Sequence, residues 1–375
     1  MRYATVLAAA QRIRDSIRRT PLLSSEHVDS IAGVRCLFKA EHLQRTGSFK
    51  MRGAANAVNS LPQEEAERGF VAHSAGNHGA ALAAAAQGRG VPCTIVVPSD
   101  TPAAKVNNIS RYGATVVLCE PTQRARSETA EAEATRMGGA TIVHPYDDAA
   151  VIAGQGTIAL ELLEEVPDLD AILVPTSGGG MLAGIALAAR ALRPSVRVLA
   201  VEPESKQLGR ALSEGKRVLD EATANQLLPT MADAIRTQAL GKLPWQLALE
   251  HVDRHVLSVS EPQLRDALRL SLTEMKQVVE PAGAIALAAL LSPVRRPASL
   301  TVPSLPPSLP PSLPPSLRPS LCAFLYGHSP ARAPLLPWNR ASRHCVQRRR
   351  RPVRRCGPSL PSHAAATSTS TDLRS

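Results

Sequence analysis

The chain has 375 residues, enough for two domains with a substantial core. Its formal net charge of +11 comes from one end. Residues 293–375 hold 13 Arg, no Lys and one acid, whereas residues 1–292 hold 30 basic and 31 acidic residues. The positive charge therefore does not indicate that the main part of the chain binds nucleic acid.

The cysteines and the apolar runs exclude further classes of protein. The six cysteines form no Cys-x-x-Cys pair, so neither a zinc site nor a disulfide framework is predicted. The N-terminal residues lack a charged-then-apolar signal pattern, and no uncharged apolar run reaches membrane-spanning length. We therefore expect a cytoplasmic protein with no membrane partner.

Apolar periodicity predicts strands alternating with helices through most of the chain. An amphipathic helix is predicted at 3–17, a strand at 34–39 and a helix at 49–59. Further strands are predicted at 70–73, 94–98, 115–119, 141–144, 171–175, 197–202 and 255–259, and helices at 79–87, 103–112, 124–137, 155–165, 181–192, 261–276 and 283–291. Continuous Val, Ile and Leu strands between helices are typical of an α/β fold with parallel sheets covered on both faces.

The composition changes abruptly at Pro293. The segment from there to the end contains 16 of the 31 prolines, Pro-Ser-Leu repeats and an arginine run at Arg348–Arg351. Such a segment has too little apolar surface to offset the entropy of ordering, so we predict a disordered low-complexity tail over 293–375. The arginine run fits a nucleic-acid contact or a localisation signal, but we favour a solvated tail without a nucleic-acid partner.

Lys50 lies in the stretch Glu41–Ala54, between Phe49 and a run of small residues. A desolvated lysine amine has a lowered pKa and can form a Schiff base with a carbonyl group. Taken alone, this stretch fits an ordinary surface lysine better. The choice between the two depends on the rest of the chain.

Two glycine-containing turns, each between a predicted strand and a predicted helix, are suited to anions. Residues 74–79 read Ser-Ala-Gly-Asn-His-Gly, and free N–H groups at the start of the following helix would suit a carboxylate. Residues 176–181 read Thr-Ser-Gly-Gly-Gly-Met, and successive glycine N–H groups would suit a phosphate. A cofactor phosphate near a Schiff-base lysine indicates pyridoxal phosphate.

With these three motifs in order, the chain resembles the fold-type II pyridoxal-phosphate enzymes of the serine/threonine dehydratase and serine racemase branch. The resemblance covers about residues 5–292 and includes Val151–Glu161 and Glu280-Pro-Ala-Gly283. It implies two domains, each with a mainly parallel sheet flanked by helices, and a homodimer. We expect a large cofactor-binding domain from 1–68 and 148–292, a small domain at 69–147, and the tail at 293–375.

The resemblance also implies roles for individual residues. Lys50 would form the Schiff base with pyridoxal phosphate and remove the Cα proton of a small amino-acid substrate. Phe49 would pack on the cofactor ring, and Asn77 would hydrogen-bond its ring oxygen. The substrate carboxylate would be held by Ser74, Ala75, Gly76 and His78, the last mainly through its backbone. The phosphate would be held by Ser177, Gly178, Gly179, Gly180 and Met181.

Ala75 separates two reactions that begin with the same proton removal. Loss of a β-hydroxyl group leads to a 2-oxo acid and ammonia, whereas racemisation needs a second acid on the opposite face. In the racemases this acid is the second serine of Ser-Ser-Gly-Asn-His, and the dehydratases carry alanine there. We therefore predict a serine/threonine dehydratase (an ammonia-lyase), with serine racemase as the alternative.

Two departures from the family bear on metal binding and activity. Some relatives bind a divalent metal such as Mg²⁺ at a position that Glu202 matches, but Leu208 stands where a second carboxylate is expected. The family's last strand and Ser-Gly-Gly-Asn turn are not recognisable after Leu291, so a central strand is expected to be missing. An inactive family member and a basic-tail binding protein are therefore the competing hypotheses.

Overall fold

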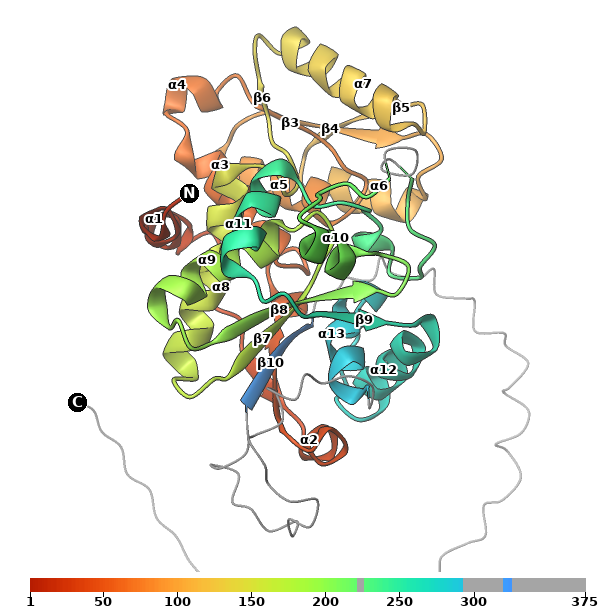
Figure 1. The fold of residues 1–375 in the computed structure, drawn as a ribbon. Coiled ribbons are helices and arrows are strands. Elements are labelled where there is room, and N and C mark those ends of the chain that lie inside the picture. The colour runs from red at the N-terminus through yellow and green to blue at the C-terminus, as the bar shows by residue number, and fades with distance from the viewer. Residues whose placement is uncertain (221–225, 293–319, 326–375) are drawn as a thin grey trace, which may run out of the picture. The chain divides into compact units, whose positions relative to one another are not determined.

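The computed structural model describes residues 1–220, 226–292 and 320–325, all within one compact unit, Met1–Ala331 (Figure 1). The helices are α1 Tyr3–Ile13, α2 Glu26–Ala32, η1 Glu41–Leu43, α3 Lys50–Ser60, α4 Gln63–Ala66, α5 Asn77–Arg89, α6 Ala103–Ser110, α7 Gln123–Arg136, α8 Ala149–Glu165, α9 Gly180–Leu192, α10 Leu208–Glu214, η2 Asp233–Ile235, α11 Lys242–His251, α12 Glu261–Thr273 and α13 Pro281–Leu291. The strands are β1 Leu22–Ser24, β2 Arg35–Ala40, β3 Phe70–His73, β4 Cys93–Pro98, β5 Thr115–Cys119, β6 Thr141–Ile142, β7 Ala171–Pro175, β8 Arg197–Pro203, β9 Val256–Val259 and β10 Ser320–Leu325.

The strands form two sheets, and every pairing among the described strands is parallel except that of β1 with β2. The larger sheet has the order β1-β2-β10-β7-β8-β9, and the smaller has the order β5-β4-β3-β6. This confirms the predicted α/β class with mainly parallel sheets. The strands of the smaller sheet all fall within 69–147, while the domain boundaries themselves stay a prediction.

Buried strands and alanine-rich helices explain the layers. All five residues of β7 are buried, and β8 is buried after its first residue. The adjoining helices α8 and α9 have mostly small residues on their contact faces: a Cβ added to Gly156 would lie 2.7 Å from the Gly184 carbonyl oxygen. Glycine at these positions therefore lets the two helices approach closely against the larger sheet.

The expectation that a central strand is missing is wrong. Ser320–Leu325 forms β10, which lies between β2 and β7 and pairs in parallel with both. Leu321 pairs with Cys36 on one side and with Ala171 on the other, and its side chain is buried. Without this strand, β2 and β7 would face each other with unpaired backbone groups inside a parallel sheet.

The Pro-Ser repeats concealed this strand, because the composition of the whole segment outweighed six apolar-rich residues. The predicted tail 293–375 therefore includes one strand of the core sheet. The remainder of the predicted tail, with the position of the Ser-Gly-Gly-Asn turn and the arginine run, lies outside the described residues.

Most other predicted elements agree with the structure to within a few residues, and a local hydrogen bond explains the largest shift of a helix start. Helix α8 begins at Ala149, six residues before the predicted start, because the Asp148 side chain accepts a hydrogen bond from Val151 N at 2.9 Å. Helix α1 ends at Ile13 rather than at residue 17. Strand β1 and helices α2, α4, α10 and α11 were not predicted.

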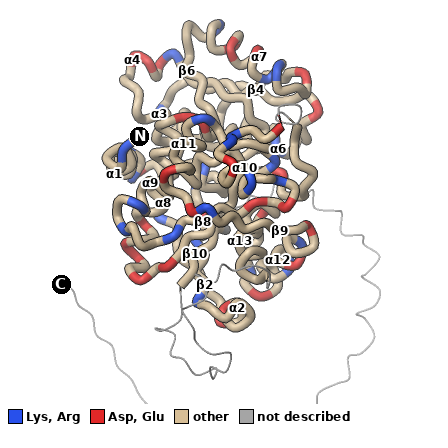
Figure 2. Tube along the Cα trace, in the orientation of Figure 1, with Lys and Arg blue, Asp and Glu red and all other residues tan. Residues whose placement is uncertain are grey.

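Charged residues of both signs lie along the outer helices α7 and α12, and α4 carries two glutamates (Figure 2). This distribution agrees with the near-neutral charge of residues 1–292. Among the described residues, no helix combines the length and the apolar character that crossing a membrane requires.

Candidate active site

The candidate site lies where strands of both parallel sheets end and helices begin. Strand β3 leads through residues 74–76 into α5, and β7 leads through residues 176–179 into α9. Both helices have 13 residues, and their first turns present free N–H groups. Ligands of parallel α/β sheets bind at this edge of the strands.

Lys50 is the first residue of α3, and its side chain is partly buried. The Nζ atom donates a hydrogen bond to the Pro145 carbonyl oxygen at 2.7 Å and lies 5.2 Å from the centre of the Phe49 ring. Burial lowers the pKa of Lys50 to about 8, against the opposing charge of Glu280. A minor fraction of the amine is therefore neutral near physiological pH and available as a nucleophile or base.

The turn at residues 74–78 is tight and partly buried. Gly76 N donates to the Ser74 hydroxyl at 3.4 Å, and a Cβ on Gly79 would lie only 2.2 Å from the Ser74 carbonyl oxygen. The side chain of Ala75 packs beside the smaller sheet's apolar core. The sequence Ser-Ala-Gly-Asn-His-Gly thus fits a turn that a side chain at Gly79 would obstruct.

His78 is held in its neutral form by burial. Its Nε2 lies 3.0 Å from the Val143 carbonyl oxygen, and its pKa falls to about 3 through desolvation and the nearby charge of Lys50. Neutral His78 therefore donates Nε2–H to Val143. The imidazole of His78 is thus engaged with Val143, and the expected role of its backbone toward a substrate carboxylate stays a prediction.

Asn77 connects the two sheet systems. Its Nδ2 donates to Glu280 Oε1 at 2.9 Å, and Glu280 immediately precedes α13. Its Oδ1 is buried without a hydrogen-bond partner among the described residues. Burial and the charge of Asp233 raise the pKa of Glu280 to about 8, so this carboxyl group keeps a proton at neutral pH.

The glycine loop at residues 176–180 is built for close approach. Gly179 has a positive φ of 90°, which favours glycine. A Cβ on Gly178 would lie 2.3 Å from the ring of Tyr146, and a Cβ on Gly180 would lie 2.9 Å from the Tyr146 backbone. Because Pro145 accepts from Lys50, the segment 145–146 brings the glycine loop and the lysine together.

The flanks of the glycine loop have their own partners. The Ser177 hydroxyl lies 3.0 Å from the Thr237 hydroxyl, and Gly178 O accepts from Gly241 N at 3.0 Å. The Met181 side chain is buried in the core of the larger sheet. Only the main chain of Met181 is therefore free to take part in anion binding.

These residues fit pyridoxal phosphate. A partly buried amine with a lowered pKa, a buried amide oxygen without a partner among the described residues and a glycine cradle lie together near the ends of β3 and β7, which belong to the two different sheets. They match, in order, the aldehyde, the polar ring substituents and the phosphate of the cofactor.

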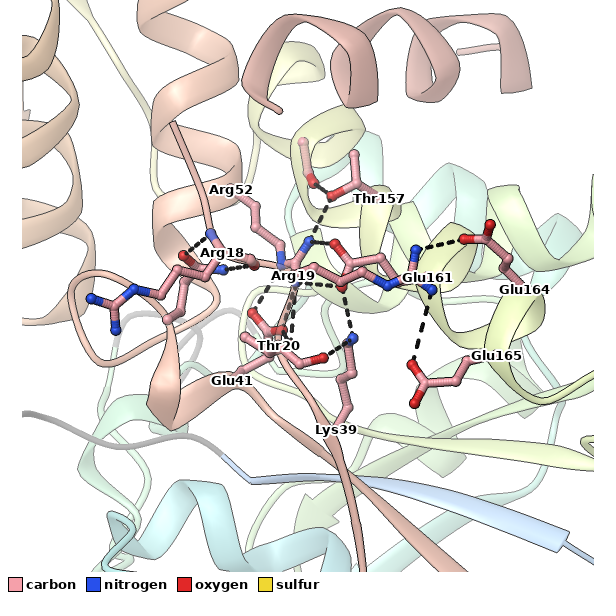
Figure 3. A network of polar contacts seen from close by, with 12 residues as sticks. Arg18, Arg19, Thr20, Lys39, Glu41, Arg52, Thr157, Glu161, Glu164 and Glu165 are labelled. Atoms are coloured by element: carbon pink, nitrogen blue, oxygen red, sulfur yellow. Dashed lines mark hydrogen bonds and ion pairs between the residues drawn. The ribbon is translucent and has the colours of Figure 1, made fainter. Parts of the chain in front are cut away.

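A buried cluster of charged side chains supports the helix that carries Lys50 (Figure 3). Arg52 Nη2 lies 2.8 Å from Glu41 Oε1, and Arg52 Nη1 lies 2.6 Å from Glu161 Oε1. Lys39 Nζ lies 2.7 Å from Glu161 Oε2. Two positive and two negative charges are thus paired, and the cluster joins α3 to β2, η1 and α8.

The pairing keeps these groups ionised despite burial. Burial would lower the pKa of Arg52, but the charges and hydrogen bonds of Glu41 and Glu161 raise it above its usual value. Burial would likewise raise the pKa of Glu161, but Arg52 and Lys39 hold it below its usual value. Arg52 and Glu161 therefore stay charged at physiological pH, and their pairing fixes the start of α3.

Both carboxylate oxygens of Glu202 have hydrogen-bond partners within the protein. Its Oε2 accepts from Leu208 N at 2.9 Å, and its Oε1 accepts from the Ser258 hydroxyl at 3.3 Å. Burial raises the pKa of Glu202 to about 7. In the three described ranges, no cluster of three or more His, Cys, Asp or Glu side chains is placed to hold a metal ion.

Four residues of the site were missed by sequence reasoning or had no role assigned: Tyr146, Lys206, Thr237 and Glu280. Tyr146 had a usable signal, since it follows closely after a predicted strand at the edge where the other motifs lie. The other three come from distant segments, and only the folded chain brings them to the glycine loop or to Asn77.

Comparison with known proteins agrees with this geometry. The model of a family described as "Pyridoxal-phosphate dependent enzyme" matches residues 13–300. The chain is 43% identical over 288 residues to the serine racemase of Arabidopsis thaliana, covering 77% of this chain and 85% of the relative. It is 40% identical over 290 residues to the β-hydroxyaspartate dehydratase of Paracoccus denitrificans (strain Pd 1222), covering 77% and 90%.

Solved structures show the same similarity in three dimensions. Maize serine racemase has a TM-score of 0.78 at 35% identity, covering 87% of this chain and 93% of that one. The threonine deaminase of T.th. has a TM-score of 0.75 at 39% identity, covering 88% of this chain and 98% of that one.

Proposed function

We propose that this chain, which belongs to the pyridoxal-phosphate dependent enzymes of the serine/threonine dehydratase and racemase family, acts on a small amino acid. Its reaction would begin with removal of the Cα proton of L-serine or L-threonine. Bound pyridoxal phosphate supplies the electron sink that makes this proton removable. Lys50 is the base, because its amine is partly buried and its pKa is lowered to about 8.

The surrounding residues would position cofactor and substrate. Residues 177–181 would hold the phosphate through main-chain N–H groups and the Ser177 hydroxyl, while Phe49 would pack on the ring. The turn from Ser74 to His78, including Ala75 and Gly76, would hold the substrate carboxylate at the start of α5. These assignments rest on the convergence of the three segments near the ends of strands β3 and β7 of the two sheets.

The side-chain amide of Asn77 would hydrogen-bond the ring oxygen of the cofactor. Because Glu280 keeps a proton at neutral pH, it can donate to Asn77 Oδ1 once the amide rotates. This rotation frees the Asn77 Nδ2 donor for an acceptor oxygen on the cofactor. The Asn77–Glu280 pair would thus respond to cofactor binding.

Elimination of the β-hydroxyl group is the outcome that the site supports best, and Ala75 carries this conclusion. A methyl group cannot deliver a proton to the face opposite Lys50. After Lys50 has taken the Cα proton, residue 75 cannot return a proton to the opposite face of Cα. Departure of the β-hydroxyl group is therefore favoured over racemisation. The products would be a 2-oxo acid and ammonia.

Serine racemisation is the second candidate, and two observations favour it. Relatives at 41–43% identity from Arabidopsis thaliana, rice and Dictyostelium discoideum are named serine racemases, which supports racemisation more directly than elimination. Glu280 also offers a protonated carboxyl group beside Asn77, and the charge of its ionised form interacts with Lys50. It is therefore an alternative proton donor in place of the absent serine.

The decisive experiment measures both products from one reaction. The purified full chain with pyridoxal phosphate is given L-serine, and D-serine and pyruvate are quantified together over time. We expect pyruvate to form at least about tenfold faster than D-serine. Comparable rates would favour racemisation, and bound cofactor without either product would indicate an inactive family member.

The oligomeric state and the cellular location of the protein are predictions. We propose a homodimer in the cytoplasm, with a small amino acid as ligand. Size-exclusion chromatography with light scattering would test the homodimer.

A further inference from the structure

Lys206 is a buried ammonium group enclosed by main-chain oxygens. Its side chain is 1% exposed, and its Nζ donates to the carbonyl oxygens of Ser177 at 2.6 Å, Thr237 at 2.8 Å and Thr176 at 3.3 Å. An ammonium group has three donors, and here each has its own acceptor. The charge is thus bound as a cation is bound in a carbonyl cage.

The position of this ammonium group makes it relevant to the phosphate loop. Thr176 and Ser177 are the first residues of the glycine loop, and Thr237 lies on the segment that follows η2. The hydroxyl groups of Ser177 and Thr237 also lie 3.0 Å apart. Lys206 therefore ties the start of the loop to a distant segment and places a positive charge behind it.

The surroundings are those that a hard metal ion would use, but the donors are already taken. Carbonyl oxygens and a carboxylate are ligands of Mg²⁺ and Ca²⁺. Here the carbonyl oxygens bind Lys206, while the nearby Glu202 accepts from Leu208 N and the Ser258 hydroxyl. The charges of Lys206 and Glu202 also act on each other. A divalent ion would have to displace the ammonium group.

We propose that Lys206 acts as a built-in cation, which holds the glycine loop in its phosphate-binding shape and makes that binding independent of divalent metal ions. Lys206 is a positioning residue in this role, since it contacts the loop from behind and not the reacting atoms. The inference rests on the proposed pyridoxal phosphate at this loop. It replaces the expectation of a Mg²⁺ site at Glu202 with a reason why none is needed.

The test compares two ligands that differ only in the phosphate. The apo form of the full chain is titrated with pyridoxal phosphate and with pyridoxal, following intrinsic tryptophan fluorescence, in EDTA and in millimolar MgCl₂. The ratio of the two affinities isolates the contribution of the phosphate. For the wild-type chain we expect this ratio and the thermal midpoint to be the same in EDTA and MgCl₂.

Two substitutions separate charge from volume. Lys206→Met keeps most of the side-chain length without the ammonium group, and we expect it to reduce the phosphate contribution by about tenfold or more. Lys206→Ala leaves space between the carbonyl oxygens that a Mg²⁺ ion can fill. MgCl₂ should therefore raise the ratio of the pyridoxal phosphate and pyridoxal affinities more in Lys206→Ala than in Lys206→Met. The exposed Lys216→Met is the matched control and should behave as the wild type does.

The outcomes distinguish the inference from the proposed function. An EDTA-sensitive wild type, an unchanged Lys206→Met variant, or an equal response of both variants to MgCl₂ would overturn the built-in cation alone. If the wild type binds pyridoxal as tightly as pyridoxal phosphate, the proposed cofactor fails as well. None of these readouts depends on turnover, so the product of the reaction does not affect them.

Discussion

Asn77 and Glu280 are 203 positions apart in the chain, yet Asn77 Nδ2 donates to Glu280 Oε1 at 2.9 Å. The contact joins the start of α5, which follows a strand of the smaller sheet, to the start of α13, which packs on the larger one. Burial raises the Glu280 pKa to about 8, so the pair includes a carboxyl group that can release a proton.

Replacing Glu280 with glutamine should separate the two candidate reactions. Glu280→Gln keeps a hydrogen-bonding partner for Asn77 but removes the acidic proton. If Glu280 returns a proton to Cα, D-serine formation should fall about a hundredfold while pyruvate formation changes much less. Glu274→Gln, on an exposed side chain, is the control. Equal losses of both products would show that Glu280 only supports the site.

Replacing Ala75 with serine should increase racemisation. Ala75→Ser introduces a hydroxyl group at the position where the racemases carry their second acid. We expect D-serine formation from L-serine to rise by about tenfold or more, measured by chiral chromatography. Ala84→Ser, on the helix that follows this turn and also partly buried, controls for an added hydroxyl group. An unchanged ratio of D-serine to pyruvate would contradict the role assigned to residue 75.

Covalent capture of pyridoxal phosphate by Lys50 should increase with pH. Below a pKa of about 8 the amine is protonated and cannot attack the aldehyde, and above it the amine is free. Trapping by borohydride, followed by mass spectrometry, should therefore rise between roughly pH 6 and pH 9 with its midpoint near the Lys50 pKa. Glu280 titrates in the same range, so Glu280→Gln is measured in parallel. Lys50→Ala should show no trapping, and a midpoint near that of a free lysine would refute the lowered pKa.

Removing the guanidinium of Arg52 should destabilise the fold. Arg52→Met leaves Glu41 completely buried without its ion-pair partner, which costs about 3–5 kcal/mol in the free energy of unfolding. Urea titration followed by circular dichroism measures this change. Arg124→Met removes an ion pair of the same 2.6 Å length as that of Arg52 with Glu161, but on an exposed helix face, and should have little effect. Similar losses in the two variants would contradict a special role for the buried cluster.

Shortening Phe324 should test whether β10 is part of the core. Phe324 is fully buried on this strand, so Phe324→Ala should lower the free energy of unfolding by about 3–5 kcal/mol. Leu118→Ala, on strand β5 with a side chain that is 59% exposed, is the control. If Phe324→Ala unfolds at the same urea concentration as the wild type, residues 320–325 are not inserted in the sheet.

The sequence by itself was sufficient for the α/β class and for the three segments around Lys50, Ser74–His78 and Ser177–Met181. Each of these signals lies within a few consecutive residues, because a strand, a glycine turn and the following helix start are set by local backbone geometry. Their order along the chain was enough to indicate one cofactor site.

Only the tertiary structure placed β10, Glu280 and Lys206. Strand β10 is a short apolar run after proline-rich repeats, and its place becomes evident only from the gap between β2 and β7. In the sequence, Glu280 belongs to a segment of the family resemblance without a role of its own, and nothing local shows that Lys206 is buried. Their chemistry depends on burial and on partners supplied by distant segments, which no local pattern records.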